Sequence, residues 1–119
     1  MSKAGEFVLT LMHAATNAHI LHLQSRSFSE HSALGEFYQA LPDLADKLAE
    51  AIQGAEQELL SYPADYFAPA ATGLDELLEL QAYVDQERQS ISQRSEIQNI
   101  VDEISDLIDS TLYKLKFLK

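Results

Sequence analysis

The chain has no cysteine and no tryptophan, and only three prolines and four glycines among its 119 residues. Without thiols, disulfides and thiolate-bound zinc or iron–sulfur clusters are excluded, and a small domain without disulfides is more typical of the reducing cytoplasm. No apolar run approaches the ~20 residues that cross a bilayer, and no secretory signal is recognised near the N-terminus. The sequence therefore predicts a soluble, cytoplasmic protein with no membrane partner.

Basic residues are also few. Eight Lys and Arg stand against 19 Asp and Glu, which gives a formal net charge of −11. Such an acidic surface repels phosphate backbones, so binding to DNA is not expected. The hydrophobic share of 46% is nevertheless that of a folded protein. Because the chain is too short for two independent cores, we expect a single domain over residues 1–119.

No segment alternates strictly between apolar and polar residues, whereas helical periodicity is widespread. It predicts four helices, at about 4–26, 30–61, 73–90 and 95–118. Ser27, Thr72 and Ser95 are the expected N-caps, and Pro42 should kink or break the second helix. Residues 62–73 are expected to form a connection across the bundle. The sequence thus predicts an all-α four-helix bundle, running up-down-down-up or up-down-up-down.

The expected buried positions follow the same spacing in three of the helices. They are Val8, Met12, Ala15, His19 and His22 in the first; Leu34, Tyr38, Leu41, Ala45, Leu48, Ile52, Ala55 and Leu59 in the second; and Ile97, Val101, Ile104, Ile108, Thr111, Leu115 and Leu118 in the last.

Histidines and carboxylates are the residues that could carry chemistry, because nucleophile-elbow and phosphate-loop motifs are absent. His19 and His31 flank the turn between the first two helices, so their imidazoles could approach one ion or each other. Asp46 and Glu50 are four residues apart and project from one helix face. Imidazole nitrogens with carboxylate oxygens suit iron, manganese or zinc. Alternatively, the histidines are packed, hydrogen-bonded residues and the carboxylates belong to a solvated face.

Helix geometry constrains a site made of all four residues. His31 and Asp46 share the second helix and are fifteen residues apart, which is roughly 22 Å at 1.5 Å per residue. One ion cannot bridge that distance within a chain. The carboxylates would have to come from a second subunit packed antiparallel across a two-fold axis, which creates two equivalent sites per dimer.

The stretch from Asn17 to Gly54, NAHILHLQSRSFSEHSALGEFYQALPDLADKLAEAIQG, resembles the Dps (DNA protection during starvation) mini-ferritins of the ferritin-like superfamily. In that family a histidine late in the first helix is followed at fixed spacing by a second histidine, an aspartate and a glutamate. The matching positions here are His19, His31, Asp46 and Glu50. The segment around Tyr113 resembles the family's aromatic closing segment. In its short length the chain also resembles small viral homologues.

The resemblance implies a ferritin-like four-helix bundle with a ferroxidase centre between two-fold-related subunits. His19, His31, Asp46 and Glu50 would then be both the metal ligands and the catalytic residues, and ferrous iron would be oxidised by dioxygen or peroxide. It also implies a homodimer at least, and in the family a cage of twelve subunits that stores iron or protects against oxidative stress. For a viral member the location would be the host cytoplasm.

Several positions depart from the family pattern. Thr16 and Ile20 stand where the family usually has a histidine and a tryptophan. Gly35 stands where the family has an accessory acidic residue, and Glu36 is one position out of register. A second metal position would therefore lack this carboxylate. A basic N-terminal tail and the Glu-x-x-His motif of classical ferritins are absent. The alternative function, from another class, is a non-enzymatic acidic helical protein that binds a partner protein as a nucleic-acid mimic or adaptor.

Overall fold

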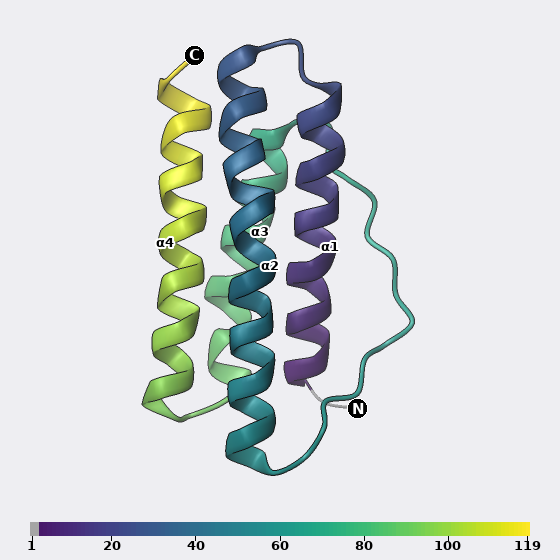
Figure 1. Cartoon of the computed structure of the whole chain (residues 1–119), viewed down its shortest axis with the longest axis vertical. Coiled ribbons are helices and arrows are strands. Elements are labelled where there is room, and N and C mark those ends of the chain that lie inside the picture. The colour runs from purple at the N-terminus through teal and green to yellow at the C-terminus, as the bar shows by residue number, and fades with distance from the viewer. Residues whose placement is uncertain (1–2) are drawn as a thin grey trace.

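Four α-helices and one turn of 3₁₀-helix make up the secondary structure of residues 3–119, the part of the chain that this computed structural model describes (Figure 1). The α-helices are α1 (Lys3–Gln24), α2 (Phe28–Glu56), α3 (Gly73–Glu87) and α4 (Ser95–Phe117), and the 3₁₀-helix η1 is Arg88–Ser90. No strand occurs within the described range. The predicted all-α architecture with four helices is confirmed.

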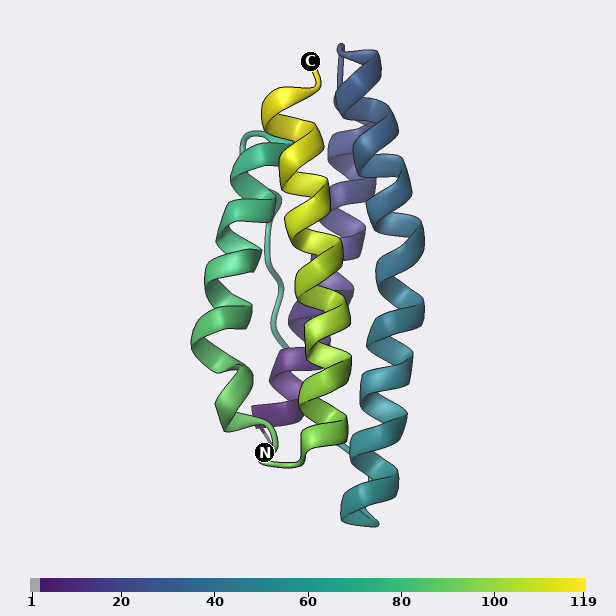
Figure 2. The ribbon, with the colours of Figure 1, turned by 90° about the vertical axis from the view of Figure 1, so that its left-hand side faces the viewer.

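The helices run up-down-down-up, the first of the two predicted arrangements (Figure 1). A tight turn joins α1 to the antiparallel α2. Residues 57–72, hereafter the connection, then run along the outside of α1 to the opposite end of the bundle, so α3 is parallel to α2. Figure 2 shows α4 between α3 and α2, with α1 behind. The connection therefore lies beside α1 and α3, away from α4.

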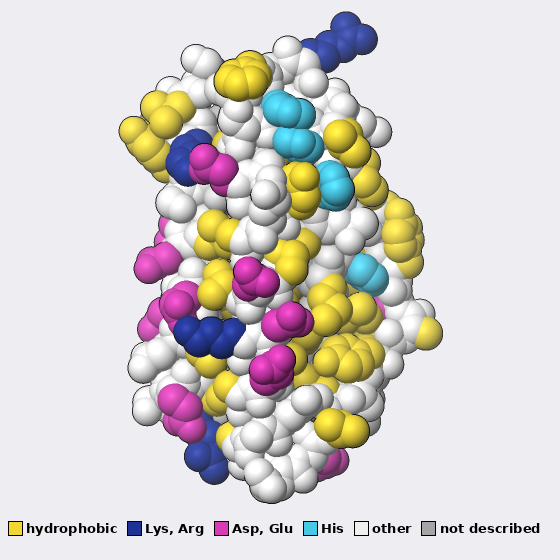
Figure 3. Space-filling view, viewed as in Figure 1, with side chains coloured by type: hydrophobic (Ala, Val, Ile, Leu, Met, Phe, Trp, Pro, Cys, Tyr) yellow, Lys and Arg dark blue, Asp and Glu magenta, His cyan; other side chains and the backbone are white. Residues whose placement is uncertain are grey.

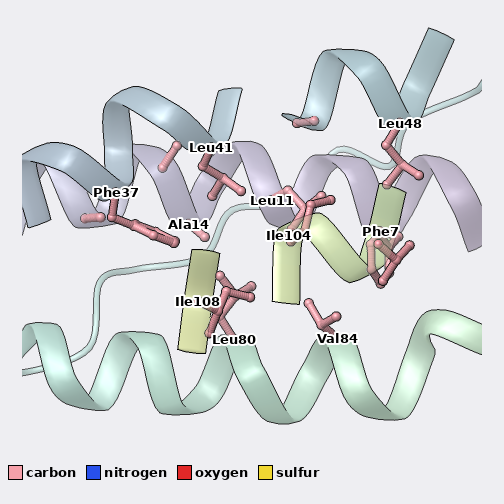
Figure 4. Packing of buried hydrophobic residues seen from close by; sticks show 14 of the residues in the cluster. Phe7, Leu11, Ala14, Phe37, Leu41, Leu48, Leu80, Val84, Ile104 and Ile108 are labelled. Atoms are coloured by element: carbon pink, nitrogen blue, oxygen red, sulfur yellow. The ribbon is translucent and has the colours of Figure 1, made fainter. Parts of the chain in front are cut away.

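Buried apolar side chains from all four helices form one core (Figure 4). Phe7 and Leu11 of α1 and Phe37 of α2 are fully buried, as are the α4 residues Ile104 and Ile108. Burying a side chain of this size contributes about 1.5–3 kcal/mol each, which is the main force holding the helices together. Most predicted core positions of α2 and α4 are confirmed as buried: Leu34, Leu41, Ala45, Leu48, Ile52, Ile97, Val101, Ile104, Ile108, Thr111 and Leu115.

The predicted inward stripe of α1 is partly wrong. Val8 and Ala15 are buried, but Met12 is 40% exposed and His19 is also exposed, while His22 is only half-buried. The true buried face is rotated by about one position and includes Phe7, Leu11, Ala14, Ala18 and Leu21. In α2, Tyr38 and Ala55 are half-buried.

Two of the three predicted N-caps are confirmed. Ser27 Oγ accepts a hydrogen bond from Glu30 N at 3.3 Å, and Thr72 Oγ1 accepts one from Asp75 N at 3.1 Å. Each satisfies a first-turn amide that has no partner inside the helix. The expected cap at Ser95 is wrong, because Ser95 is already the first residue of α4 and the cap position is Arg94, whose side chain makes no capping bond.

Helix α2 ends at Glu56, five residues before the predicted end. Gln57 has a left-handed backbone (φ 56°), and its N–H donates to the Gln53 carbonyl. The Gln53 side chain then accepts from Leu60 N at 3.0 Å, which turns the chain away from the helix axis. Leu59, predicted to be buried, is consequently 82% exposed. Leu118, which follows the end of α4, is also exposed rather than buried.

Pro42 does not break α2, which is continuous from Phe28 to Glu56. Pro42 is exposed on the solvent side of α2, where helices accommodate the loss of one backbone hydrogen bond most easily. Continuity matters because His31, Asp46 and Glu50 are thereby fixed on one rigid rod. None of the helices within residues 3–119 is long and apolar enough to span a membrane.

Candidate metal-binding face on helices α1 and α2

Three histidines meet near the turn between α1 and α2. His22 and His31 stack with ring centroids 3.7 Å apart and an interplanar angle of 16°. His19 stacks flat on Tyr38 at 4.0 Å, and its centroid is 6.2 Å from that of His22. His19, His22, His31 and Tyr38, which we call the histidine cluster, therefore form a continuous group of rings. His19 and His31, the two predicted ligands, are linked through His22.

Reciprocal hydrogen bonds fix the stacked pair. His22 Nδ1 lies 2.6 Å from the His31 carbonyl oxygen, and His31 Nδ1 lies 2.8 Å from the His22 carbonyl oxygen. A carbonyl can only accept, so each Nδ1 must carry the proton. In a neutral ring the lone pair is then on Nε2. This is the arrangement found in metal-binding histidines, whose second nitrogen is usually held by a carbonyl or carboxylate.

Gly35 makes room for this pairing. A Cβ placed there would be 3.0 Å from His22 Cε1 and 3.2 Å from His22 Nδ1, which is closer than side chains normally approach. Position 35 is where the Dps-like pattern has an accessory acidic residue. In this chain the imidazole of His22 occupies the space beside that position instead. The glycine at position 35 and the position of the His22 ring therefore depend on each other.

Asp46 and Glu50 lie farther along α2, and both are exposed. Neither carboxylate has a hydrogen bond or an ion pair in the described part of the chain, whereas the intervening Lys47 pairs with Glu103 at 3.0 Å. Fifteen residues at 3.6 per turn is just over four turns, so Asp46 returns close to the side of α2 that carries His31. Both carboxylates are therefore free to bind something outside their own chain.

The surface formed by α1 and α2 carries histidines, apolar side chains and carboxylates, in that order from one end to the other. Figure 3 shows histidines at the upper end of the face formed by α1 and α2, hydrophobic side chains below and beside them, and carboxylates lower on α2. Across residues 3–119, no three His, Asp or Glu side chains are placed where a single chain could hold a metal ion. The four predicted ligands are thus not brought together in one subunit.

The fourth histidine, His13, belongs to a different part of the molecule. Its ring packs edge-on against Phe67 of the connection, with centroids 5.1 Å apart, and near Tyr66 at 6.2 Å. The sequence predicted His22 as a buried position and not as a ligand, yet His22 is the residue in direct contact with His31. The spacing of nine residues across the turn and the missing side chain at Gly35 are the signals that could have found it.

Comparison with known proteins gives a family without an assigned activity. A stretch of 53 residues is 38% identical to a protein of Enterobacteria phage T4 named "uncharacterized 14.6 kDa protein in mobD-ri intergenic region", covering 44% of this chain and 41% of that relative's length. No solved structure gives a significant match. The model of the family described as "Family of unknown function (DUF5856)" matches residues 22–115, which is most of the chain and includes His22, His31, Asp46 and Glu50. The chain therefore belongs to the DUF5856 family.

Proposed function

We propose that this protein forms a two-fold dimer that binds ferrous iron and oxidises it with dioxygen or peroxide. His31 and His19 of one subunit and Asp46 and Glu50 of the other would form each site. The observation that carries the proposal is the state of the donors. His31 has its Nδ1 held by a carbonyl, and the two carboxylates have no partner in the described residues of their own chain.

The continuous α2 supports the dimer. Because His31 and Asp46 are on one unbroken helix, roughly 22 Å separates them along its axis. Two copies of this face, packed antiparallel about a two-fold axis, place the histidines of each beside the carboxylates of the other. The apolar side chains between them in Figure 3 would then be covered, as expected for an interface.

The donor set suits iron as a substrate. Neutral imidazole nitrogens bind Fe²⁺, and the carboxylates stabilise the higher charge of Fe³⁺. Manganese and zinc suit the same donors and could compete. The net charge of −11 raises the local concentration of cations around the molecule. The single long connection in an up-down-down-up bundle is also the topology of ferritin-like proteins. A Dps-like, ferritin-like identity is therefore part of this proposal, as is assembly into a larger cage.

Stopped-flow oxidation of Fe²⁺, followed by the ultraviolet absorbance of ferric iron, tests the proposal. Asp46→Asn removes a charged ligand with little change in volume, so folding should persist while the rate falls at least tenfold. Asp85→Asn is the matched control, because it removes the same charge from an exposed position on α3. Equal rates for wild type and Asp46→Asn would refute the proposed site.

Mixing two inactive variants tests whether the site is shared. A heterodimer of His31→Ala with Glu50→Ala keeps one intact site of two. Random assortment makes half of the dimers mixed, so about a quarter of the wild-type activity should return. If each site instead lay within one subunit, the mixture would be as inactive as its components.

The rival function is partner binding by an acidic helical protein. The described chain has five ion pairs for 19 acidic residues, so most carboxylates on its surface are unpaired. Such a surface could occupy the basic cleft of a nucleic-acid-binding protein. A measurement of iron binding separates the two functions, because partner binding requires no iron.

A further inference from the structure

A pocket of about 530 Å³ opens between α1, the connection and α3. Figures 1 and 2 show the connection running alongside α1 and α3 at this side of the bundle, away from α4. This volume lies within the range of about 300–1,000 Å³ that is typical of pockets for small organic molecules. The pocket is separate from the carboxylates of the proposed iron site.

A buried asparagine holds the pocket's outer wall in place. Asn17, which is 3% exposed, donates from Nδ2 to the Phe67 carbonyl at 3.2 Å and to Glu76 Oε2 at 3.4 Å. The other oxygen of Glu76 accepts from Ala70 N at 2.9 Å. The connection is thus tied to both α1 and α3. Both carboxylate oxygens of Glu76 accept hydrogen bonds here. These bonds fix the part of the connection that forms the outer wall of the pocket.

Two further carboxylates line the pocket without a partner. Glu6 of α1 and Glu79 of α3 both border it, and neither side chain makes an ion pair or a hydrogen bond within residues 3–119. No Lys or Arg is among the lining residues. Two like charges that share a partly enclosed space repel each other, and a bound cation would relieve that repulsion.

Aromatic rings and a histidine form the rest of the lining. Tyr66, Phe67 and Tyr83 are among the lining residues, and aromatic rings cover alkyl chains and attract cations. His13, packed against Phe67, has a buried Nδ1 with no hydrogen-bond partner in the structure. Buried ring nitrogens are normally satisfied. His13 thus borders the pocket with its ring, while its Nδ1 is enclosed by protein atoms.

We propose that this pocket binds a small aliphatic diamine, with its ammonium groups at Glu6 and Glu79 and its alkyl chain against the aromatic rings. The two carboxylates select a dication, and the rings select an alkyl body. This site is independent of the proposed iron chemistry.

Titration calorimetry with 1,4-diaminobutane at physiological salt tests the proposal, since salt screens general attraction to an acidic protein. Saturable binding is expected, and Glu79→Gln should weaken it about tenfold. Asp85→Asn, on the same helix but outside the pocket, should leave it unchanged. NMR should show the ring protons of Tyr66, Phe67 and His13 shifting, while those of His22 and His31 stay in place.

Other probes check each element of the recognition. Tetramethylammonium, which has no N–H, and 1,4-butanediol, which has no charge, should bind at least tenfold more weakly. A blocked lysine derivative offers the same ammonium chemistry as a protein side chain would, but only one charge, and should also bind more weakly than the diamine. Equal binding of the blocked lysine, or equal loss of affinity in Asp85→Asn and Glu79→Gln, would overturn the proposal.

Discussion

The histidine pair shows how a single absent side chain decides local chemistry. His22 and His31 can stack because Gly35 leaves space beside them, and each ring holds the other's tautomer through a backbone carbonyl. The sequence predicts that histidines gather at the turn between the first two helices. It could not rank His19 against His22 as the neighbour of His31, because that choice depends on the rotation of α1 by about one position.

Gly35→Ala tests this coupling between the glycine and the histidine. In an otherwise unchanged helix, alanine gains about 1 kcal/mol over glycine. Here the new Cβ displaces the His22 ring and weakens hydrogen bonds worth about 1 kcal/mol each, which offsets the gain. Urea denaturation should therefore show Gly35→Ala to be more favourable by at least ~1 kcal/mol in a His22→Ala background than in wild type. Additive effects of the two substitutions would show that His22 and position 35 are independent.

Tyr83 makes the stability of the fold depend on pH in the alkaline range. Burial raises the pKa of its hydroxyl above the usual 10.0; a hydrogen bond with Thr10 opposes this rise, and Glu6 and Glu87 add to it. The folded protein thus keeps the proton to higher pH than the unfolded chain, so stability falls as pH rises through and above 10. Tyr83→Phe keeps the ring beside Phe7 but removes the titration. Its free energy of unfolding should fall less steeply between about pH 9 and 11 than that of wild type, and equal slopes would contradict this account.

At the scale of the elements, the sequence was most informative where a side chain acts locally. The capping spacing of Ser27 predicted the start of α2, and that of Thr72 predicted the start of α3. The end of α2 could not be predicted in the same way. No glycine or proline marks it, because the left-handed residue is Gln57 and the bond that turns the chain comes from the Gln53 side chain.

The face of α1 was predicted poorly for a different reason. Apolar residues occupy most positions of its first five turns, so several stripes fit the helical period equally well. Which one is buried is decided by packing against α2 and α3, and Phe7 and Leu11 are selected over Met12. For the candidate site, the four ligand residues and the second subunit remain predictions from the sequence. It could not predict the contact between His22 and His31, which depends on the same rotation.

Two serines provide a matched test of the helix starts. Ser27→Ala should lower the free energy of unfolding by about 1 kcal/mol, because it removes the acceptor for Glu30 N. Ser95→Ala should change it by less than ~0.5 kcal/mol, since Ser95 lies inside α4 and is exposed. Chemical denaturation of both variants measures the difference. A larger loss for Ser95→Ala would mean that α4 starts later than observed.

For the whole molecule, the charge distribution determines what can approach it. Lys114 pairs with Glu36 at 2.7 Å, and Lys47 pairs with Glu103, so even the few basic groups are partly neutralised. We therefore expect no appreciable affinity for duplex DNA at physiological salt, because too few free cations are available to release counterions from the phosphates. A gel-shift assay checks this, and a salt-sensitive shift at low micromolar protein would contradict it.

The most direct test of the interfacial iron site is an anomalous-scattering map of crystals soaked anaerobically in ferrous salt. The account predicts an iron peak beside His31 of one subunit that is also within bonding distance of Asp46 and Glu50 of a two-fold-related copy. Two such peaks should occur per dimer. A structure in which these side chains face solvent or stay apart across every symmetry contact, with no iron between them, would contradict the proposal.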